Sequence, residues 1–528
     1  MSLRMASAVL AGWIVVGGHY AAMAQSGEAG PPPQSPVTPA GAPDVAPSVR
    51  IFPRPGNVFP PPSGPGFYSL VDHVRHETRQ APPPSGYPAS AIMAPSFFDA
   101  DFRYLDSIAP DDRRPFERLK RRRVGERLLF STGGAAWYRA HAEANSRLTQ
   151  TDQTYGLGRV RAYGDLWYQD SVRVYAEVLS AWRSGGRLPP LPIDSNHADV
   201  LNAFADVKLF EVSDHPVYVR AGRQEVLLGS QRLISPLPWA NMRRNFDGVR
   251  VFRQGAKFDV DAFWLEPVVP SRAGFDQPSH DVQLAGGWFT YRPTRGHAFD
   301  LYYVYSNNST SVVQQDVTIA PSRFSTLGSR YTGDRANVLW DIEGAVQFGR
   351  QGDGDLVAHM ATVGIGRRFA QVQMSPTLWV YYDAASGDAE PNADDATTFN
   401  QLYPFGHYYL GWADIVGRQN IQDVNLHLGL YPVPWMTLWL QYHHLWLRQA
   451  RDALYNAAGA AIRRDPTGNA GTHVGDDVDV VVNVHIDAQS DVMVAYTHGF
   501  GGRFLEATAG PNTAASGQAF HLIYNVRW

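Results

Sequence analysis

The chain has 528 residues, of which 44% are hydrophobic and 12% aromatic, and it contains no cysteine. Its formal net charge of −4 provides no overall attraction to nucleic acid or to acidic polymers. No apolar run reaches the roughly 20 residues that a transmembrane helix requires, so a helical membrane protein is excluded. The 25 tyrosines and 14 tryptophans are typical of the aromatic girdles of membrane barrels, although an aromatic-rich soluble β protein has the same composition.

The first 24 residues predict a secretory signal peptide. Arg4 supplies the positive charge, residues 6–16 form a short apolar stretch, and Ala22-Met23-Ala24 is typical of a cleavage site. The absence of cysteine agrees with export through an oxidising compartment without proving it. We therefore expect the mature chain to begin at Gln25.

Residues 25–97 are dominated by proline, glycine, serine and alanine, with three Pro-Pro-Pro runs. Such a composition buries too little apolar surface to offset its ordering entropy, so it predicts a disordered periplasmic arm. We favour a spacer over a tether to a periplasmic partner. Residues 98–126 are predicted to be a periplasmic segment leading into a barrel, and the basic run at 120–123 to lie at the periplasmic rim rather than on nucleic acid.

From residue 127 onward the chain alternates between apolar and polar residues with the period of a half-buried strand. In 338–348, Ile342, Val346 and Phe348 share one face while Asp341 and Glu343 share the other. Segments of this kind predict eighteen strands, at 127–144, 157–168, 171–182, 199–210, 216–225, 245–253, 257–266, 282–292, 297–307, 322–332, 336–349, 356–370, 374–386, 418–430, 435–448, 473–486, 491–501 and 517–528.

The connections between these strands alternate in length. Short turns are expected near 169–170 and 211–215, whereas long loops are expected at 387–417 and 449–472. The last segment alternates apolar residues and ends on the aromatic Trp528, as is typical of a strand that closes a barrel against the first strand. Short turns on one side and long loops on the other indicate an all-β transmembrane antiparallel barrel, with membrane lipid as its surroundings.

Charged side chains in such a barrel are expected to face the lumen, because an arginine on the lipid face at mid-depth costs about 2–4 kcal/mol. Alternation places two sets of ions inside. The bases are Arg139, Arg159, Arg161, Arg173, Lys208, Arg220, Arg250 and Arg330, and the acids are Glu177, Asp206, Asp259, Asp261, Asp341 and Glu343. These ions either concentrate a carboxylated solute or pair with one another and brace the lumen, and both roles are compatible with the sequence.

Several motifs recur through the strand region and its approach. They are Val219–Glu225 with Gly229 and Arg232-Leu233, then Arg244–Arg250, then Tyr382–Asp388 with Tyr403-Pro404, His407 and Gly417–Asn420, and Asp101–Leu105 ahead of the first strand. Together these motifs resemble the alginate export family of bacterial outer-membrane porins. The resemblance covers about residues 100–528. It implies an eighteen-stranded barrel, passage of an anionic exopolysaccharide, and pore-lining roles for Arg223, Arg232, Arg244 and Arg250.

Enzyme signatures are missing from the sequence: it has no G-x-S-x-G, HExxH or Walker A motif. We expect neither an enzyme nor a cofactor. His443 and His444 are adjacent on one predicted strand and point to opposite faces, so they cannot share a metal ion. The acidic loop at 388–395 lacks the spacing of an EF-hand, which favours a solvated loop over a calcium site.

The sequence therefore predicts an outer-membrane porin that conducts an anionic, alginate-like polysaccharide through an arginine-lined lumen. A closed barrel needs no second copy to cover its strand edges, so we expect a monomer. Two alternatives remain open, an uptake porin for small carboxylated nutrients and a barrel-embedded hydrolase.

Overall fold

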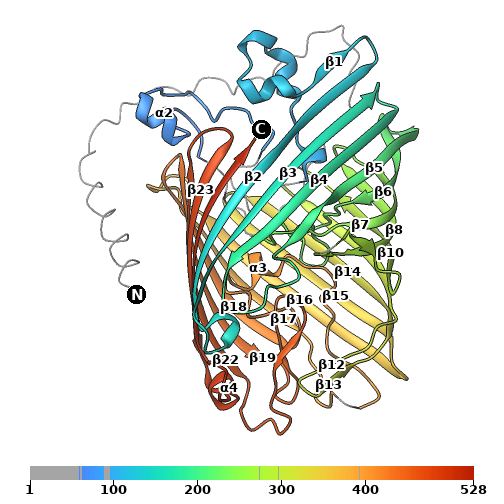
Figure 1. Cartoon of the computed structure of the whole chain (residues 1–528), viewed down its shortest axis with the longest axis vertical. Helices are drawn as coiled ribbons and strands as arrows, with labels where there is room; N and C mark the ends of the chain where they lie inside the picture. The colour runs from blue at the N-terminus through green and yellow to red at the C-terminus, as the bar shows by residue number, and fades with distance from the viewer. Residues whose placement is uncertain (1–58, 60–61, 88–95, 273, 295, 392) are drawn as a thin grey trace. The chain divides into compact units, whose positions relative to one another are not determined.

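Eighteen long antiparallel strands close into a barrel in the computed structural model (Figure 1). The structure describes Phe59, residues 62–87 and residues 96–528 except 273, 295 and 392. The barrel strands are β2 (Leu128–Ala144), β3 (Gln153–Tyr168), β4 (Val172–Gly185), β5 (Asn196–Val212), β6 (His215–Gln224), β7 (Phe246–Arg253), β8 (Phe258–Val269), β10 (Val282–Tyr291), β11 (Ala298–Asn308), β14 (Ser322–Arg335), β15 (Val338–Gln351), β16 (Gly354–Arg368), β17 (Thr377–Ala385), β18 (Ile421–Val433), β19 (Met436–Leu447), β22 (His473–His485), β23 (Ser490–Gly501) and β24 (Gly517–Arg527).

Each of these strands pairs with the next along the chain, and the last pairs with the first. The closing contact runs from Ala135 opposite Arg527 to Ala144 opposite Gln518. Closure leaves no strand edge unpaired in lipid, where every main-chain donor and acceptor needs a partner. The predicted eighteen-stranded barrel is confirmed.

Side-chain alternation separates a lipid face from a lumen face. On β15 the outward Ile342 and Val346 are nearly half exposed, whereas the inward Asp341 and Glu343 are 0% and 1% exposed. On β3 the inward Arg159 and Arg161 are likewise buried, while Val160 faces out. The period of two therefore places the apolar side chains against acyl tails and the charged ones inside, as predicted.

The two ends of the barrel differ. Turns of a few residues, such as 169–171 and 213–214, join the strands at what we call the short-turn end, and longer segments join them at the long-loop end. Small elements decorate these connections: β9 (Gln277–Pro278), β12 (Val312–Gln314), β13 (Val317–Ile319), β20 (Leu454–Tyr455), β21 (Ala461–Arg463), η7 (Ser146–Leu148), α3 (Gly406–Tyr409) and α4 (Arg503–Ala507). Among the residues that the structure describes, none of the helices has the length and apolarity that a membrane crossing requires.

The chain ahead of the barrel folds against its short-turn end (Figure 1). Four short 3-10 helices lead to a strand that pairs with the start of β2. These elements are η3 (Phe97–Asp99), η4 (Arg103–Ser107), η5 (Pro110–Asp112), η6 (Pro115–Leu119) and β1 (Arg122–Val124). This segment corresponds to the predicted 98–126 stretch.

The prediction of a disordered arm over 25–97 is wrong for the part that is described. Helix α2 (Leu70–Arg75) begins at the N-cap Ser69, and Asp72 pairs with Arg79 at 2.5 Å. The Val71 N–H donates to the Ile486 carbonyl at 3.0 Å, which anchors the helix to the barrel. The composition of residues 25–97 as a whole does not predict this short helix, because contacts with the barrel offset the entropy cost of ordering it. The predicted signal peptide and the rest of the arm lie outside the described residues.

The lipid face yields a test of strand orientation. Val346 lies at the middle of β15 and faces out, whereas Val172 faces out beside the short turn at 169–171. We expect Val346→Arg to lower the free energy of unfolding by about 2–4 kcal/mol and Val172→Arg by about 0–1 kcal/mol, since the cost of a lipid-facing arginine depends on depth. Denaturant unfolding of the barrel from lipid vesicles measures both, and equal losses would contradict the assigned depths.

Candidate functional site in the barrel lumen

Two long segments from the long-loop end fold back into the barrel. They are 225–245, between β6 and β7, and 386–420, between β17 and β18. The two meet in a short parallel bridge in which the Tyr403 N–H donates to the Leu233 carbonyl at 2.8 Å and the Ser235 N–H to the Tyr403 carbonyl at 2.9 Å. Each segment thus satisfies main-chain groups of the other deep inside the barrel.

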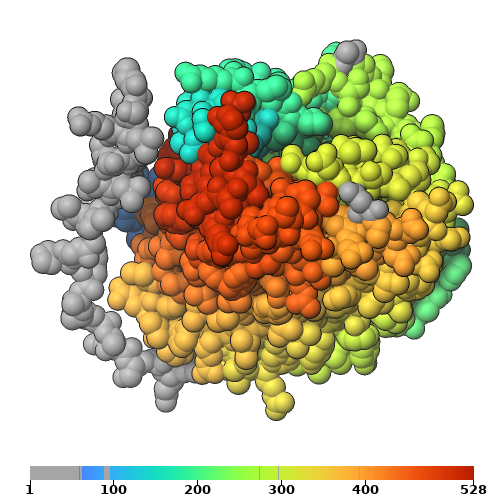
Figure 2. Space-filling view, turned by 90° about the horizontal axis from the view of Figure 1, so that it is seen from below, coloured from blue at the N-terminus to red at the C-terminus, as the bar shows by residue number. Residues whose placement is uncertain are grey.

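Aromatic side chains of these segments fill the middle of the lumen. Trp239 stacks on His407 with ring centroids 3.8 Å apart and meets Trp412 edge-on at 5.2 Å. Trp137 and Trp439 from the wall complete the same buried cluster. Seen from the long-loop end, the barrel is covered by chain (Figure 2). Beneath this surface, the buried aromatic cluster of the inserted segments occupies the lumen.

Most of the predicted pore arginines are held by carboxylates. Arg161 pairs with Glu177 at 2.7 Å, Arg173 with Asp165 at 2.7 Å, Arg220 with Asp206 at 2.6 Å and Arg330 with Asp341 at 2.6 Å, while Arg250 pairs with Asp261. All five arginines are buried in the wall. The bracing role that the sequence left open applies to this set, because a bidentate or charge-assisted hydrogen bond fixes both partners.

Arg232 reaches the wall from an inserted segment. It lies in 225–245 and pairs with Asp341 and Glu343 of β15, at 2.8 Å each. The Ser230 hydroxyl donates to the same Glu343 at 2.6 Å. These buried ion pairs hold segment 225–245 against strand β15. Strand alternation does not predict this contact, because Arg232 lies outside the strands.

Two of the cations that the sequence predicts in the lumen lie elsewhere. Arg223 pairs with Asp247 at 2.8 Å on the face that it shares with the exposed Ala221 and Val249, so the predicted pore-lining role of Arg223 is wrong. The Asp276 carbonyl of a covering loop accepts from Arg223, which makes this outward cation tolerable. Lys208 lies at the short-turn end, where it pairs with Asp170 at 2.5 Å and Glu211 at 2.6 Å.

Arg139 and Arg159 stand apart, because neither has a carboxylate partner among the described residues. The Arg139 guanidinium lies 3.9 Å from the Trp239 ring centroid and donates to the Trp239 carbonyl at 3.1 Å. Arg159 lies 4.0 Å from the Trp137 ring centroid and donates to the carbonyls of Ala240 and Asn241, at 2.9 and 3.3 Å. Both cations thus hold one turn of the inserted segment 225–245 against the wall.

Arg244, another predicted pore cation, also has no carboxylate partner within the described part of the chain. It lies over the Tyr403 ring at 5.2 Å and donates weakly to the carbonyls of Ser235 and Pro404, at 3.4 and 3.3 Å. Burial lowers the pKa of Arg244 to about 10, so the side chain stays cationic at neutral pH.

The neighbouring wall is acidic. Asp477 and Asp479 on β22 are buried and form no ion pair with lysine or arginine among the described residues. Asp479 accepts instead from the Trp412 N–H at 3.2 Å, and Asp477 from the Thr497 hydroxyl at 3.1 Å. Nothing in the sequence showed that Asp479 would meet an inserted segment.

The short-turn mouth of the lumen is filled by the segment before the barrel. Phe98 packs edge-on against Tyr175 and Phe204, at 5.5 and 5.1 Å, and its carbonyl accepts from Arg173 at 2.7 Å. A cavity of about 100 Å³ remains beside it, with Arg220 among its lining residues. No pattern in the sequence predicts that this segment enters the barrel.

Lys120 fastens that segment to the barrel. Its ammonium donates to the Thr132 carbonyl at 2.7 Å, the Tyr163 hydroxyl at 2.8 Å and the Trp528 main-chain oxygen at 2.9 Å. The side chain is 1% exposed, and burial lowers its pKa to about 7. Lys120 of the predicted rim run therefore lies buried beneath the segment rather than exposed on its surface.

The adjacent histidines face opposite ways, as predicted. His443 points inward to Asp423, at 2.8 Å, and His444 points outward to Asp476, at 2.6 Å. In the acidic loop, Asp388 accepts from the main-chain N–H groups of Glu390 and Thr397, at 2.9 and 3.1 Å, and so shapes its own turn.

Comparison with known families agrees with this architecture. Residues 129–518 match the profile described as alginate export. The chain belongs to the alginate export family. It is an outer-membrane porin of bacteria, so its short-turn end faces the periplasm and its long-loop end the exterior. No curated protein sequence matches the chain.

Similar solved structures include three from Pseudomonas aeruginosa. OccD3 (OpdP) is 13% identical with a TM-score of 0.49, over 75% of this chain and 91% of that one. OpdK is 11% identical with a TM-score of 0.49, over 75% and 99%. OpdK with vanillate is 11% identical with a TM-score of 0.48, over 75% and 98%. None of these likenesses bears on what this family member conducts.

The aromatic closure predicts a gain of conductance. Trp239→Ala removes the stack on His407, and aromatic pairs of this kind contribute about 0.5–1.5 kcal/mol, so we expect the open fraction to rise by up to about tenfold. Planar-bilayer recording of the purified barrel measures it. Trp264→Ala is the matched control, because Trp264 faces lipid and is 46% exposed. Equal behaviour of the two variants would mean that Trp239 does not hold the lumen shut.

Burial of Lys120 predicts a pH dependence of segment docking. Its docked pKa of about 7 is below its usual value of 10.5, so the undocked state binds more protons between these values. Docking of 97–120 should therefore strengthen as pH rises from about 7 to about 10.5, and change little below 7. Hydrogen exchange, corrected for its intrinsic pH dependence, measures the protection of this segment. Lys120→Met should abolish the slope, whereas Lys257→Met, at an exposed turn, should leave it intact.

Proposed function

We propose that this porin conducts a carboxylated polysaccharide, of the alginate type, through the lumen when the inserted segment 225–245 moves aside. The observation that supports the proposal is the pair of lumen cations, Arg139 and Arg159, that have no carboxylate partner in the described part of the chain. Their guanidinium groups donate only to main-chain oxygens of the segment, at Trp239, Ala240 and Asn241.

The ions around these two arginines are of both signs. The buried neighbours Arg161 and Arg243 pair with Glu177 and Glu225. Arg139 and Arg159 have no such partner among the described residues, and the acids Glu143 and Asp414 near Arg139 lie beside His141 and His407. An anion that reaches the two guanidinium groups therefore meets donors that no carboxylate holds, which favours its binding there.

The guanidinium donors of Arg139 and Arg159 also suit a carboxylated polysaccharide. When the segment withdraws, each guanidinium loses a hydrogen bond to a main-chain carbonyl oxygen, and a carboxylate oxygen of the solute takes the same position. The new hydrogen bond is stronger than the old one, because both of its partners are charged. The ring of Trp137, which belongs to the wall, lies beside Arg159, and a flat apolar ring suits the C–H face of a sugar ring. A chain of uronate residues offers both features at each step.

A second candidate function is the uptake of small carboxylated nutrients. The cavity at the periplasmic mouth, about 100 Å³, accommodates several waters or a small organic acid, and Arg173, Arg220 and Arg250 line it. Each of these arginines is already paired with an aspartate, which weakens the attraction for a further anion. We therefore rank uptake below polymer conduction.

The remaining expectations stay predictions. We propose that the barrel acts as a monomer without a cofactor and without hydrolase activity. Incubation of the purified barrel with phospholipid and peptide substrates tests the last point, and turnover of either would contradict it. A periplasmic partner docked on the N-terminal arm is likewise a proposal, to be tested by crosslinking in cells.

Charge selectivity tests the proposed role of Arg159. We expect Arg159→Gln to lower the anion-to-cation permeability ratio by about fivefold, the factor that corresponds to about 1 kcal/mol between unit charges 4 Å apart in water. Arg159→Lys should preserve the ratio because it keeps the charge. Arg223→Gln is the matched control, because Arg223 lies on the outer face. Reversal potentials in planar bilayers report the ratio, and an unchanged ratio in Arg159→Gln would remove the basis of the proposal.

The size of the solute separates the two candidates in the same recordings. Block of the current by a uronate polymer, but not by the uronate monomer, supports polymer conduction. Block by the monomer at equal or lower concentration supports uptake.

A further inference from the structure

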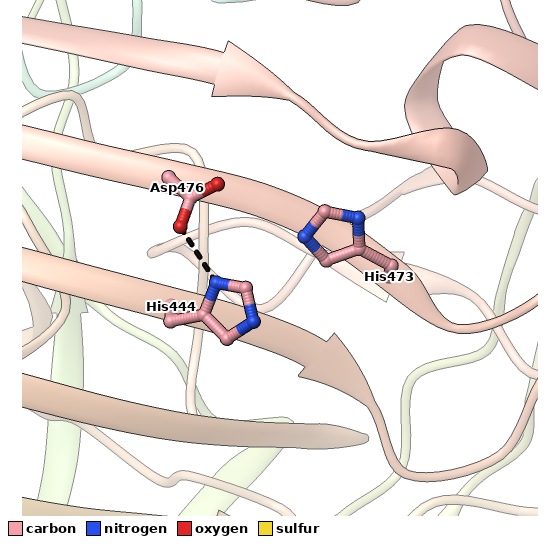
Figure 3. Close-up of side chains that lie close together, drawn as sticks. All are labelled: His444, His473 and Asp476. Carbon is pink, nitrogen blue, oxygen red and sulfur yellow. Dashed lines mark hydrogen bonds and ion pairs between the residues drawn. The ribbon is translucent and has the colours of Figure 1, made fainter.

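Three side chains with metal-binding atoms gather on the outward face of the barrel, near its exterior rim. They are His444 of β19 and His473 and Asp476 of the adjacent β22 (Figure 3). One donor atom from each lies within 4.8 Å of the other two. His444 Nδ1 is 2.6 Å from Asp476 Oδ1, and all three side chains are partly buried. This group lies apart from the lumen and takes no part in the proposed conduction.

An irregularity in strand pairing creates the arrangement. His444 lies opposite Asp476, Leu445 opposite Gly475 and Trp446 opposite His473, so one extra residue is inserted in β22. Without this bulge, His473 would face the lumen, because it is three residues from the outward Asp476. Gly475 adopts a φ of +144°, a conformation that favours glycine. The fold thus turns His473 onto the face that already holds His444 and Asp476.

The Nε2 atom of His473 is a second observation that points to a ligand at this position. This atom is buried and has no hydrogen-bond partner among the described residues. In Figure 3 one ring nitrogen of His473 is turned toward His444 and Asp476. A buried ring nitrogen without a partner loses the hydrogen bond it would make to water. A metal ion between the three side chains would satisfy it.

The surroundings orient the donors as outer contacts of metal sites do. The Tyr442 hydroxyl donates to Asp476 Oδ1 at 2.6 Å, which fixes the carboxylate. The Trp446 ring lies edge-on to His444 with centroids 4.0 Å apart and shields one side. Such contacts raise the affinity of metal ligands and fix their orientation.

We propose that His444, His473 and Asp476 bind a divalent transition-metal ion, with zinc as the cation that suits them. Two imidazoles and one carboxylate form a common donor set for Zn²⁺, and water takes the fourth position of a tetrahedral site. Calcium and magnesium prefer an all-oxygen set, which these residues do not supply. The bound ion replaces the proton that His444 and Asp476 share, and it joins β19 to β22 where the bulge interrupts their ladder.

Zinc titration of the full-length, untagged barrel in detergent tests the site. Isothermal titration calorimetry should give one Zn²⁺ per chain, and His473→Ala and Asp476→Asn should each abolish this binding. Tyr442→Phe should weaken it by about tenfold, as loss of an outer contact does. His280→Ala is the matched control, because His280 also lies 3.0 Å from a carboxylate, that of Glu266, but the described residues place no third ligand near it.

Cobalt supplies a readout that does not depend on stability. Co²⁺ bound to the wild-type barrel should show the visible absorption of a four-coordinate site, and His473→Ala should lack it. Resistance of the folded barrel to SDS before heating shows that each variant is folded. Equal zinc uptake by wild type and His473→Ala, or no uptake by the folded wild type, would overturn the proposal.

Discussion

The need to pair every main-chain hydrogen-bonding group in hydrocarbon governs this molecule. A sheet in lipid satisfies that need only by closing on itself, and here β24 returns to β2 over ten residue pairs, from Ala135–Arg527 to Ala144–Gln518. Closure in turn fixes where each side chain points, because successive residues alternate between lipid and lumen. The outward Val346 and the inward Glu343 on one strand are both consequences of that geometry.

The same constraint determines what the lumen contains. Ions excluded from lipid collect inside, and most of them pair across neighbouring strands, as Arg220 does with Asp206. The segments that enter the lumen must also satisfy their main-chain groups, and they do so on each other and on arginines of the wall. Arg139 and Arg159 hold the inserted segment through its main-chain oxygens. In the proposed function, the same two side chains receive an anion when those oxygens withdraw, so that closure and selectivity depend on one pair of arginines.

Prediction from sequence succeeded where a local repeat sets the outcome and failed where distant segments meet. Alternation identified all eighteen strands and the inward Arg161 and Asp341. It could not place Arg232, which belongs to a loop, or Arg223, where a covering loop allows a cation on the outer face. It also missed helix α2 in a proline-rich stretch, since docking on the barrel rather than local composition orders that helix.

By itself the sequence determined the barrel, its strand number and the polar character of its interior, because a period of two and the cost of charge in lipid act residue by residue. The tertiary structure alone decided which arginines are already neutralised, that two inserted segments close the lumen, and that a single extra residue in β22 turns His473 outward. Those features depend on contacts between residues far apart in the chain. No local pattern encodes them, because the free energy of such a contact is set by its partner.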